Sequence, residues 1–485
     1  MDNTPLPIQS VLSNREVAEA WKRKAFAGRR NHSVANPRRN EQGGIMKKKL
    51  LAFITFAVAV SFCFTLSFAA EKPYAGTTLN ILMEAVPDTE SIEPLLAEFQ
   101  NETGIKVMIE KVVYTIMHEK LVPQLMAGEG NGSYDLLQVD NYWVGEFVKA
   151  GWLQTIDSRL AKTPQIKLSD YIDSVVKMFT VGDKNYFVPQ WTYPFGLAYL
   201  DDVVSDPKFH QFYEKKTGKK WVFPPKDMFE YADMAKAAKA FTPDNMYGCA
   251  MQGAKVDPIV MEFTNYLYGL GGGYYNRTTW KSTFNSPDGL NAMKIYKDLI
   301  ENAAQPGANG ANFDDAFNVF GQGKAVFAIT HNFLMPWLLD KTKSVVADRV
   351  RFIPLPGGGL LGGWAWAIPV SSPHPDAAWE FIKWAETKKI QKARAMGGGM
   401  PTVKWIYNDP EFLAKYPFQK NVAEVIARAK ALPIISQSTR MVEIVGENVS
   451  TAMIGDVSLE QAAKKIATEL DEIVEGDPLV EMQKK

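Results

Sequence analysis

Residues 77–114, "TTLNILMEAVPDTESIEPLLAEFQNETGIKVMIEKVVY", contain the pattern that decides the fold. The stretches at 77–85 and 104–114 have the apolar and β-branched composition of strands, and Ser91–Glu102 between them places apolar residues on one helical face. The alternation continues with another helical segment and a buried strand as far as residue 140. Strands and helices that alternate in this way predict a parallel sheet with crossover helices.

The loops that follow these predicted strands are the first candidates for a binding site. In parallel sheets with crossover helices, ligands lie beyond the carboxyl ends of the strands. That rule points to residues 85–91, 112–117 and 139–144, where acidic, amide and aromatic side chains occur together. We therefore expect these three loops to line a cleft.

A second set of strand and helix patterns begins after residue 184. "KNYFVPQWTYPFGLAYLDDVV" (184–204) contains two prolines, which suit a crossover between domains better than a central strand. Helical patterns at 228–241, 286–302 and 374–395 then enclose further apolar strands. Since 485 residues exceed one ordinary domain, the sequence predicts an α/β protein with two domains.

The stretch "MKKKLLAFITFAVAVSFCFTLSFAA" (46–70) has the three parts of a secretory signal peptide. Lysines precede an apolar run, and small residues follow it. An uncleaved membrane anchor is the alternative, because the run approaches membrane-spanning length; the polar sequence that follows favours cleavage. We interpret residues 1–45 as a leader assigned from a start codon too far upstream, with a genuine basic leader as the alternative. The mature protein is expected in the periplasm.

Composition argues against several functions. The formal net charge is zero, and the leader and signal peptide hold an excess of Lys and Arg, so the remainder is net negative and has no nucleic-acid footprint. Removal of the signal peptide leaves Cys249 alone, which excludes an intramolecular disulfide. We find no zinc, phosphate-loop or nucleophile motif. We therefore expect no catalytic residue, no metal and no cofactor, although one sequence does not exclude a glycosidase carboxylate pair.

Aromatic and polar side chains gather at the predicted strand ends. Carbohydrates need this mixture, because their C–H faces stack on flat rings while their hydroxyls need fixed donors and acceptors. The cluster consists of Asp88, Tyr114, Asp140, Asn141, Tyr142, Trp191, Tyr193, His331, Asn332, Trp337 and Trp364. For any one member, core packing or helix capping is the alternative. A peptide, a polyamine or an anion is the alternative ligand, and several carboxylates in the cleft would favour a polyamine.

Several segments, in order along the chain, resemble the family 1 extracellular solute-binding proteins of bacterial ABC importers, which include sugar-binding proteins. They are "EFQNETGIKV" (98–107), "YFVP" and "LAYLDDV" within 184–204, "FNVFGQGKAVFAITHN" (317–332), "VRFIPLPGG" (350–358), "GGWAWAIPVSSPHPDAAWEFIKWA" (362–385) and "GGGMPT" (397–402). The chain is most similar to the sorbitol- and mannitol-binding branch, and it also resembles the maltose-binding proteins. Trp191, Tyr193 and "ITHN" (329–332) depart from the polyol pattern, which leaves a mono- or oligosaccharide equally open.

This resemblance implies a type II periplasmic-binding-protein fold, in which two lobes, each a mainly parallel sheet flanked by helices, close like a hinge on a ligand. The N-terminal lobe would comprise 71–184 plus 349–396, and the C-terminal lobe 185–348 plus 397–485. The expected partners are a small carbohydrate or polyol and the membrane permease of an ABC importer; the protein is expected to be monomeric, without nucleic acid. Matched positions suggest these ligand-binding residues: Asp88, Tyr114, Asp140, Asn141, Trp191, Tyr193, His331, Asn332, Gly363, Trp364 and Arg440.

The segment "LLGGWAWAIPVSS" (360–372) places two glycines before two tryptophans. Strand alternation puts Trp364 and Trp366 on one face, but at different depths. We expect Trp364 to stack on ligand and Trp366 to lie in the core. Truncating Trp364 to Ala should then weaken binding with little loss of stability, and truncating Trp366 should do the reverse.

Overall fold

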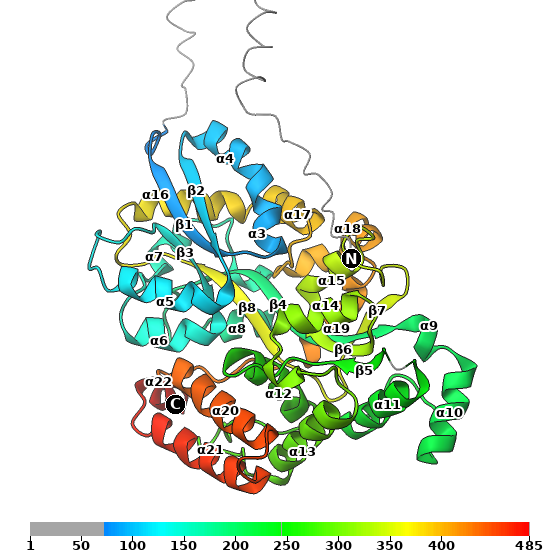
Figure 1. The fold of residues 1–485 in the computed structure, drawn as a ribbon. Helices are drawn as coiled ribbons and strands as arrows, with labels where there is room; N and C mark the ends of the chain where they lie inside the picture. The colour runs from blue at the N-terminus through cyan, green and yellow to red at the C-terminus, as the bar shows by residue number, and fades with distance from the viewer. Residues whose placement is uncertain (1–71, 244, 485) are drawn as a thin grey trace, which may run out of the picture. The chain divides into compact units, whose positions relative to one another are not determined.

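The structure is a computed structural model that describes residues 72–243 and 245–484 (Figure 1). The leader predicted at 1–45 and the signal peptide predicted at 46–70 lie outside these residues, so both stay predictions. Within the described ranges, no helix is long and apolar enough to cross a membrane.

The described strands form one mixed sheet in the order β2-β1-β3-β8-β4-β6-β5, and β7 also pairs with β4. The strands are β1 (Thr78–Glu84), β2 (Lys106–Val112), β3 (Leu136–Asp140), β4 (Val188–Leu200), β5 (Tyr247–Ala250), β6 (Ala325–His331), β7 (Val350–Ile353) and β8 (Leu361–Ala367). β1 is parallel to β2 and β3, and β5 is parallel to β6. β8 and β4 run antiparallel to their neighbours. The parallel arrangement predicted for the first three strands is confirmed. The strands in the middle of the sheet, β8 and β4, are antiparallel.

Strand β4 joins the two halves of the sheet. Its first part pairs with β8, and from Phe195 onward it pairs with β6 and β7. The segment predicted as a crossover is therefore also a central strand. Its prolines are tolerated because the register shifts between Pro189 and Trp191, and because Pro194 lies where β4 changes partners.

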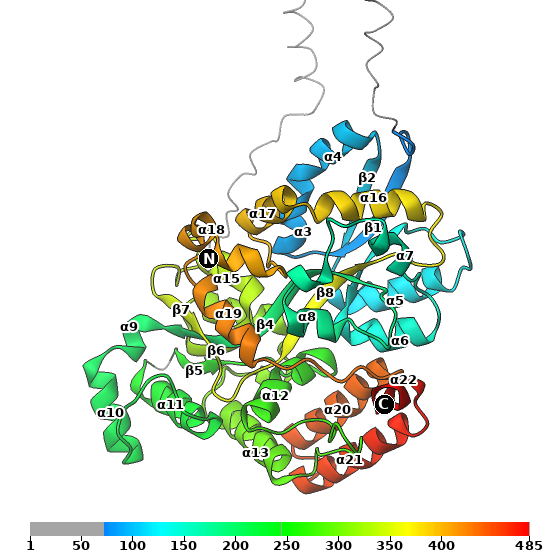
Figure 2. The same cartoon turned by 180° about the vertical axis from the view of Figure 1, so that it is seen from behind.

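Helices cover both parts of this sheet. In the first half of the chain they are α3 (Pro87–Ile92), α4 (Leu96–Thr103), α5 (Tyr114–Leu125), α6 (Val144–Lys149), α7 (Asp157–Ala161), α8 (Asp173–Met178), α9 (Asp201–Val204), α10 (Pro207–Thr217) and α11 (Met228–Phe241). They continue with α12 (Asp257–Gly269), α13 (Pro287–Asn302), α14 (Phe313–Gly321), α15 (Met335–Leu338), α16 (Pro375–Ala385), α17 (Lys388–Met396), α18 (Pro410–Lys415), α19 (Gln419–Arg428), α20 (Ser438–Met453), α21 (Leu459–Val474) and α22 (Pro478–Gln483). From both sides α12, α13, α20 and α21 lie together, and α16 and α17 lie near β1 and β2 (Figures 1 and 2).

The predicted helix at 228–241 is confirmed as α11, whereas the one predicted at 374–395 is broken in two. The break lies at Glu386 and Thr387, between α16 and α17. The Thr387 side chain accepts a hydrogen bond from the backbone N–H of Ile390, so it acts as the N-cap of a new helix. A continuous apolar periodicity could not reveal this cap.

The two tryptophans of β8 lie in different hydrophobic clusters. Trp364 belongs to the large cluster that runs through most of the molecule, while Trp366 belongs to a second cluster under α16 and α17. Trp366 is fully buried, lies edge-on to Phe381 and donates from Nε1 to Glu386 at 3.0 Å. The predicted core position of Trp366 is therefore what the structure shows.

A chain of buried polar contacts connects this second cluster to the end of β1. Arg394 lies 3.2 Å from Glu386 and 3.5 Å from Asp88. Gln190 donates to Asp88 at 3.0 Å and accepts from Gln138, whose own side-chain oxygen accepts from the backbone N–H of Glu84. Burial raises the pKa of Asp88 to about 6, and Arg394 opposes that rise. The network thus holds the strand end that carries Glu84.

Truncating Trp366 to Ala should lower the free energy of unfolding by about 3–5 kcal/mol, because it removes a fully buried indole and leaves Glu386 without one donor. Urea denaturation measures this loss. The half-buried Trp405 of the same cluster is the matched control, and its truncation should cost clearly less. A Trp366 variant as stable as wild type would contradict this view of the core.

Candidate ligand-binding site

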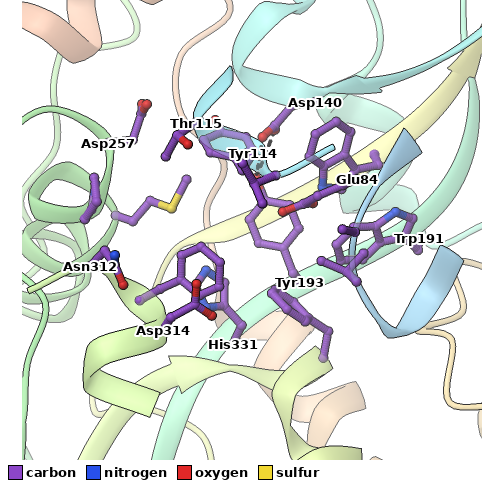
Figure 3. Close-up of a pocket in the computed structure, with 18 of the residues that line it drawn as sticks. Glu84, Tyr114, Thr115, Asp140, Trp191, Tyr193, Asp257, Asn312, Asp314 and His331 are labelled. Carbon is purple, nitrogen blue, oxygen red and sulfur yellow. Dashed lines mark hydrogen bonds between the residues drawn. The ribbon is translucent and has the colours of Figure 1, made fainter. Parts of the chain in front are cut away.

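A pocket of about 260 Å³ lies where β1, β3, β4, β6 and β8 meet the first turns of α5, α12 and α14 (Figure 3). It is lined by Glu84, Ala85, Val86, Val113, Tyr114, Thr115, Asp140, Trp191, Tyr193, Asp257, Pro258, Met261, Asn312, Phe313, Asp314, His331, Phe333, Trp337 and Trp364. Each of the three loops expected from the sequence contributes lining residues. The volume lies just below the usual range for small-molecule sites, about 300–1,000 Å³, so the pocket suits a small ligand.

Aromatic rings form one wall of the pocket. Trp364 stacks on Trp191, with centroids 5.9 Å apart and an interplanar angle of 14°, and meets Tyr114 edge-on at 6.0 Å. It also lies edge-on to Trp143 at 5.4 Å. Only 1% of Trp364 is exposed, so its neighbours hold the ring rigidly. The protein's own side chains therefore pack this wall.

The glycines before Trp364 allow this packing. A Cβ on Gly362 would overlap the ring of Tyr193, and one on Gly363 would collide with Met178. Gly362 is needed because the Tyr193 ring of β4 packs against it, while Gly363 is approached by the end of Met178 from α8 and by the backbone of Trp191 in β4. Gly363 also donates its backbone N–H to Asn141 at 3.0 Å, which ties β8 to the turn after β3.

Asp140 is the anchored carboxylate of the pocket. It accepts hydrogen bonds from the Tyr193 hydroxyl at 2.9 and 3.1 Å and from the backbone N–H of Tyr142 at 3.2 Å. Burial raises the pKa of Asp140 to about 7, against the opposing effect of these donors. Its position and charge state are thus coupled to the Tyr193 hydroxyl, which a ligand hydroxyl could replace.

Three further carboxylates lie around the pocket. Glu84 ends β1, Asp257 begins α12, and Asp314 lies in the first turn of α14 (Figure 3). Burial raises the pKa of Glu84 well above its usual range, and the charges of Asp140 and Asp314 raise it further. Burial also raises the pKa of Asp257 to about 6, while partial burial and Asp315 raise that of Asp314. The pocket therefore concentrates acidic groups.

His331, at the end of β6, lines the same pocket as a neutral ring. It is 4% exposed and packs against Phe195 with centroids 3.9 Å apart. Burial lowers its pKa to about 3, so the imidazole is uncharged at physiological pH. Its side chain makes no hydrogen bond to the described part of the chain, which leaves its nitrogens to a ligand.

The structure brings six of the expected ligand-binding residues to the pocket: Tyr114, Asp140, Trp191, Tyr193, His331 and Trp364. Trp337, from the same aromatic and polar cluster, also lines it. The other expected ligand-binding residues lie elsewhere. Asn141 and Gly363 bond to each other behind the wall, and Asn332 donates to Met400 Sδ at 3.2 Å. Asp88 belongs to the Arg394 network, and Arg440 is exposed on α20 beside Glu443 at 3.0 Å. Ligand contact by any of these residues stays a prediction.

Sequence reasoning missed the residues that the second half of the chain brings to the pocket. Asp257 and Asp314 lie in the first turns of α12 and α14, and Asn312 is the N-cap of α14; the strand-end rule did not cover these helix starts. The signal for α14 was readable, because "NFDD" (312–315) is a capping box in which Asn312 and Asp315 bond reciprocally. Glu84 was missed because the first candidate loop began at residue 85, one residue beyond it.

A family model for bacterial extracellular solute-binding proteins matches residues 85–392. The chain belongs to this family. A probable amino-acid ABC transporter periplasmic-binding protein of Sinorhizobium fredii is 23% identical, over 86% of this chain and 94% of the relative. The mannitol-binding protein of Pseudomonas aeruginosa is 23% identical, over 82% and 93%. Maltose-bound MalE3 of T. maritima is 26% identical, with a TM-score of 0.70, over 81% of this chain and 99% of that structure.

These likenesses confirm the predicted solute-binding family and the two-lobe type II periplasmic-binding-protein fold. In this solute-binding protein, β4 and β8 run through the junction of the two sheet halves, and the pocket lies on that junction. The predicted division into residues 71–184 plus 349–396 and the remainder stays a prediction.

The charge of Glu84 should make stability depend on pH. The folded state raises its pKa above the ordinary 4.5, so the unfolded chain releases this proton first and stability falls as pH rises above 4.5. Glu84→Gln removes that cost and should stabilise the unliganded protein by about 1–3 kcal/mol at pH 8 and less at pH 5. Denaturant unfolding at both pH values measures this; an advantage that does not grow with pH would contradict it. The exposed Glu119 on α5 is the control, since Glu119→Gln should change neither.

Trp364→Ala should lower both stability and affinity. The sequence led us to expect that Trp364→Ala would cost little stability. The structure argues against that expectation, because Trp191, Tyr114 and Trp143 all contact the ring. We expect a loss of about 3 kcal/mol or more in the free energy of unfolding, and at least a tenfold rise in Kd. Trp364→Phe keeps part of the contact and should lose less of both. Unchanged affinity in a folded Ala variant would exclude Trp364 from the binding wall.

Proposed function

We propose that this protein is the periplasmic substrate-binding component of an ABC importer for a sugar or sugar alcohol. It would act after removal of the predicted signal peptide, as a monomer that delivers ligand to a membrane permease, and it would bind without catalysing a reaction. Membership of the solute-binding family supports the transport role, and two of the three similar proteins named above are named for mannitol and maltose.

The observation that carries the carbohydrate assignment is the composition of the pocket. Tyr114 and the almost fully buried Trp364 line the cavity with aromatic rings, while Asp140, Tyr193 and His331 place hydrogen-bonding groups around it. Rings bind the C–H faces of a sugar, and the polar groups bind its hydroxyls. An enzyme would need an acid and base placed on either side of a glycosidic bond; the family model that matches this chain instead describes solute-binding proteins.

The pocket lies between elements from distant parts of the chain, so ligand can join them. Glu84 and Tyr114 come from the first sheet half, whereas Asp314 and His331 come from the second. A ligand that contacts both groups stabilises the closed arrangement, and a permease can then distinguish the loaded protein from the empty one.

A thermal-shift screen of sugars and polyols on the mature chain, residues 71–485, tests this function. A bound sugar at a hundred times its Kd should add about 2.7 kcal/mol of stability and raise Tm by several degrees. Small-angle scattering should show a more compact protein with ligand. If amino acids or peptides raise Tm and no sugar, amino sugar or polyol does, the carbohydrate assignment is wrong.

A further inference from the structure

Three carboxylates line the pocket at different depths: Glu84 is buried, Asp257 is half-buried and Asp314 is exposed. Within residues 72–243 and 245–484, the carboxylates of Glu84, Asp257 and Asp314 make no hydrogen bond and no ion pair. Glu84 is only 6% exposed, and Figure 3 shows its side chain among the residues that surround the cavity. A buried carboxylate without a partner is costly, because it has lost water and gained nothing in exchange. Such a group either stays protonated or takes a partner from outside the chain.

Helix capping does not explain these acids. At α14 the cap is made by Asn312 and Asp315, which leaves Asp314 unused. Asp257 lies at the start of α12, where a negative charge favours the helix dipole, but burial still raises its pKa. Glu84 ends a strand and caps nothing, since only its backbone bonds to the residues around it.

Among the described residues, His118 lowers the pKa of Asp257, while no positive charge opposes the raised pKa of Glu84 or Asp314. None of the described residues that line the pocket is Lys or Arg, and the nearby Arg394 is already paired with Asp88 and Glu386. His331 is neutral. A neutral ligand that covers Glu84 would therefore favour its protonated form, whereas a cationic ligand would stabilise the charged form.

We propose that the ligand carries a protonated amine, and that it is an amine-bearing sugar or sugar alcohol whose ammonium group lies beside Glu84, with Asp314 facing it and Asp257 further round the pocket. This rests on the proposed function, since the hydroxyl-binding side of the pocket is the carbohydrate site. The cavity of about 260 Å³ equals the volume of about nine waters, which fits an organic cation rather than a bare ion.

The aromatic wall is consistent with a cation. Faces of Trp and Tyr attract ammonium groups through their ring quadrupole, and the attraction is stronger where water is excluded. Tyr114 and Trp364 lie on the same pocket as Glu84. The unpartnered nitrogens of His331, which is nine-tenths buried, remain as neutral groups for the hydroxyls.

The test compares pairs of ligands that differ only in the amine. Calorimetric titrations at pH 7 would use 1-amino-1-deoxy-sorbitol against sorbitol and glucosamine against glucose, with spermidine as a cation without a sugar. We expect at least one amine to bind about tenfold or more tightly than its neutral partner. Glu84→Gln should raise the Kd for that amine about 30-fold and the Kd for the neutral partner much less. Asp257→Asn should also raise the Kd for the amine more than that for the neutral partner. Glu119→Gln should bind like wild type, and thermal melts show that each variant is folded.

The outcomes separate this inference from the proposed function. If neutral sugars or polyols bind as tightly as their amines, or if Glu84→Gln weakens both equally, the inference is overturned while the carbohydrate assignment stands. If spermidine binds and no member of either pair does, both are overturned. Tighter amine binding that is lost in Glu84→Gln and kept in Glu119→Gln confirms the inference.

Discussion

The pairing of β4 with two different sets of strands is the constraint on which the rest of the structure depends. One strand hydrogen-bonds first to β8 and then to β6 and β7, so the two sheet halves share a backbone at the point where they meet. A shared strand connects the two halves through main-chain bonds. The pocket lies on this junction, and its aromatic wall is built from β4 and β8 themselves.

Around that junction, stability and recognition make opposite demands on the same residues. The Arg394 network buries charges but pairs each of them, which holds the end of β1 in place. The network reaches Glu84 through the backbone N–H of that residue. The Glu84 carboxylate extends into the pocket with no partner among the described residues, and burial raises its pKa. A supported backbone that carries an unsatisfied side chain is what a binding site requires, because the ligand then supplies the missing interaction.

The strands of the first sheet half could be predicted from the sequence, whereas only some of the residues that line the pocket could. Strand and helix periodicity placed β1, β2 and β3 correctly, and the strand-end rule located Tyr114 and Asp140 at the site. Asn332 and Arg440 share the residue types of a sugar site, yet one points to Met400 and the other lies on an exposed helix. Residue type and position along a strand do not specify the direction of a side chain, because neighbouring elements decide it.

The sequence by itself determined the class of fold and the family, since both depend on local periodicity and on motifs spread along the chain. It also indicated that Trp364 and Trp366 have different surroundings, because a strand carries its residues to different depths. Only the tertiary structure decided that Trp364 is as deeply buried as Trp366, and that Glu84, Asp257 and Asp314 converge on one cavity. Those three acids are far apart in the chain, and long-range strand pairing, which no local pattern encodes, brings them together.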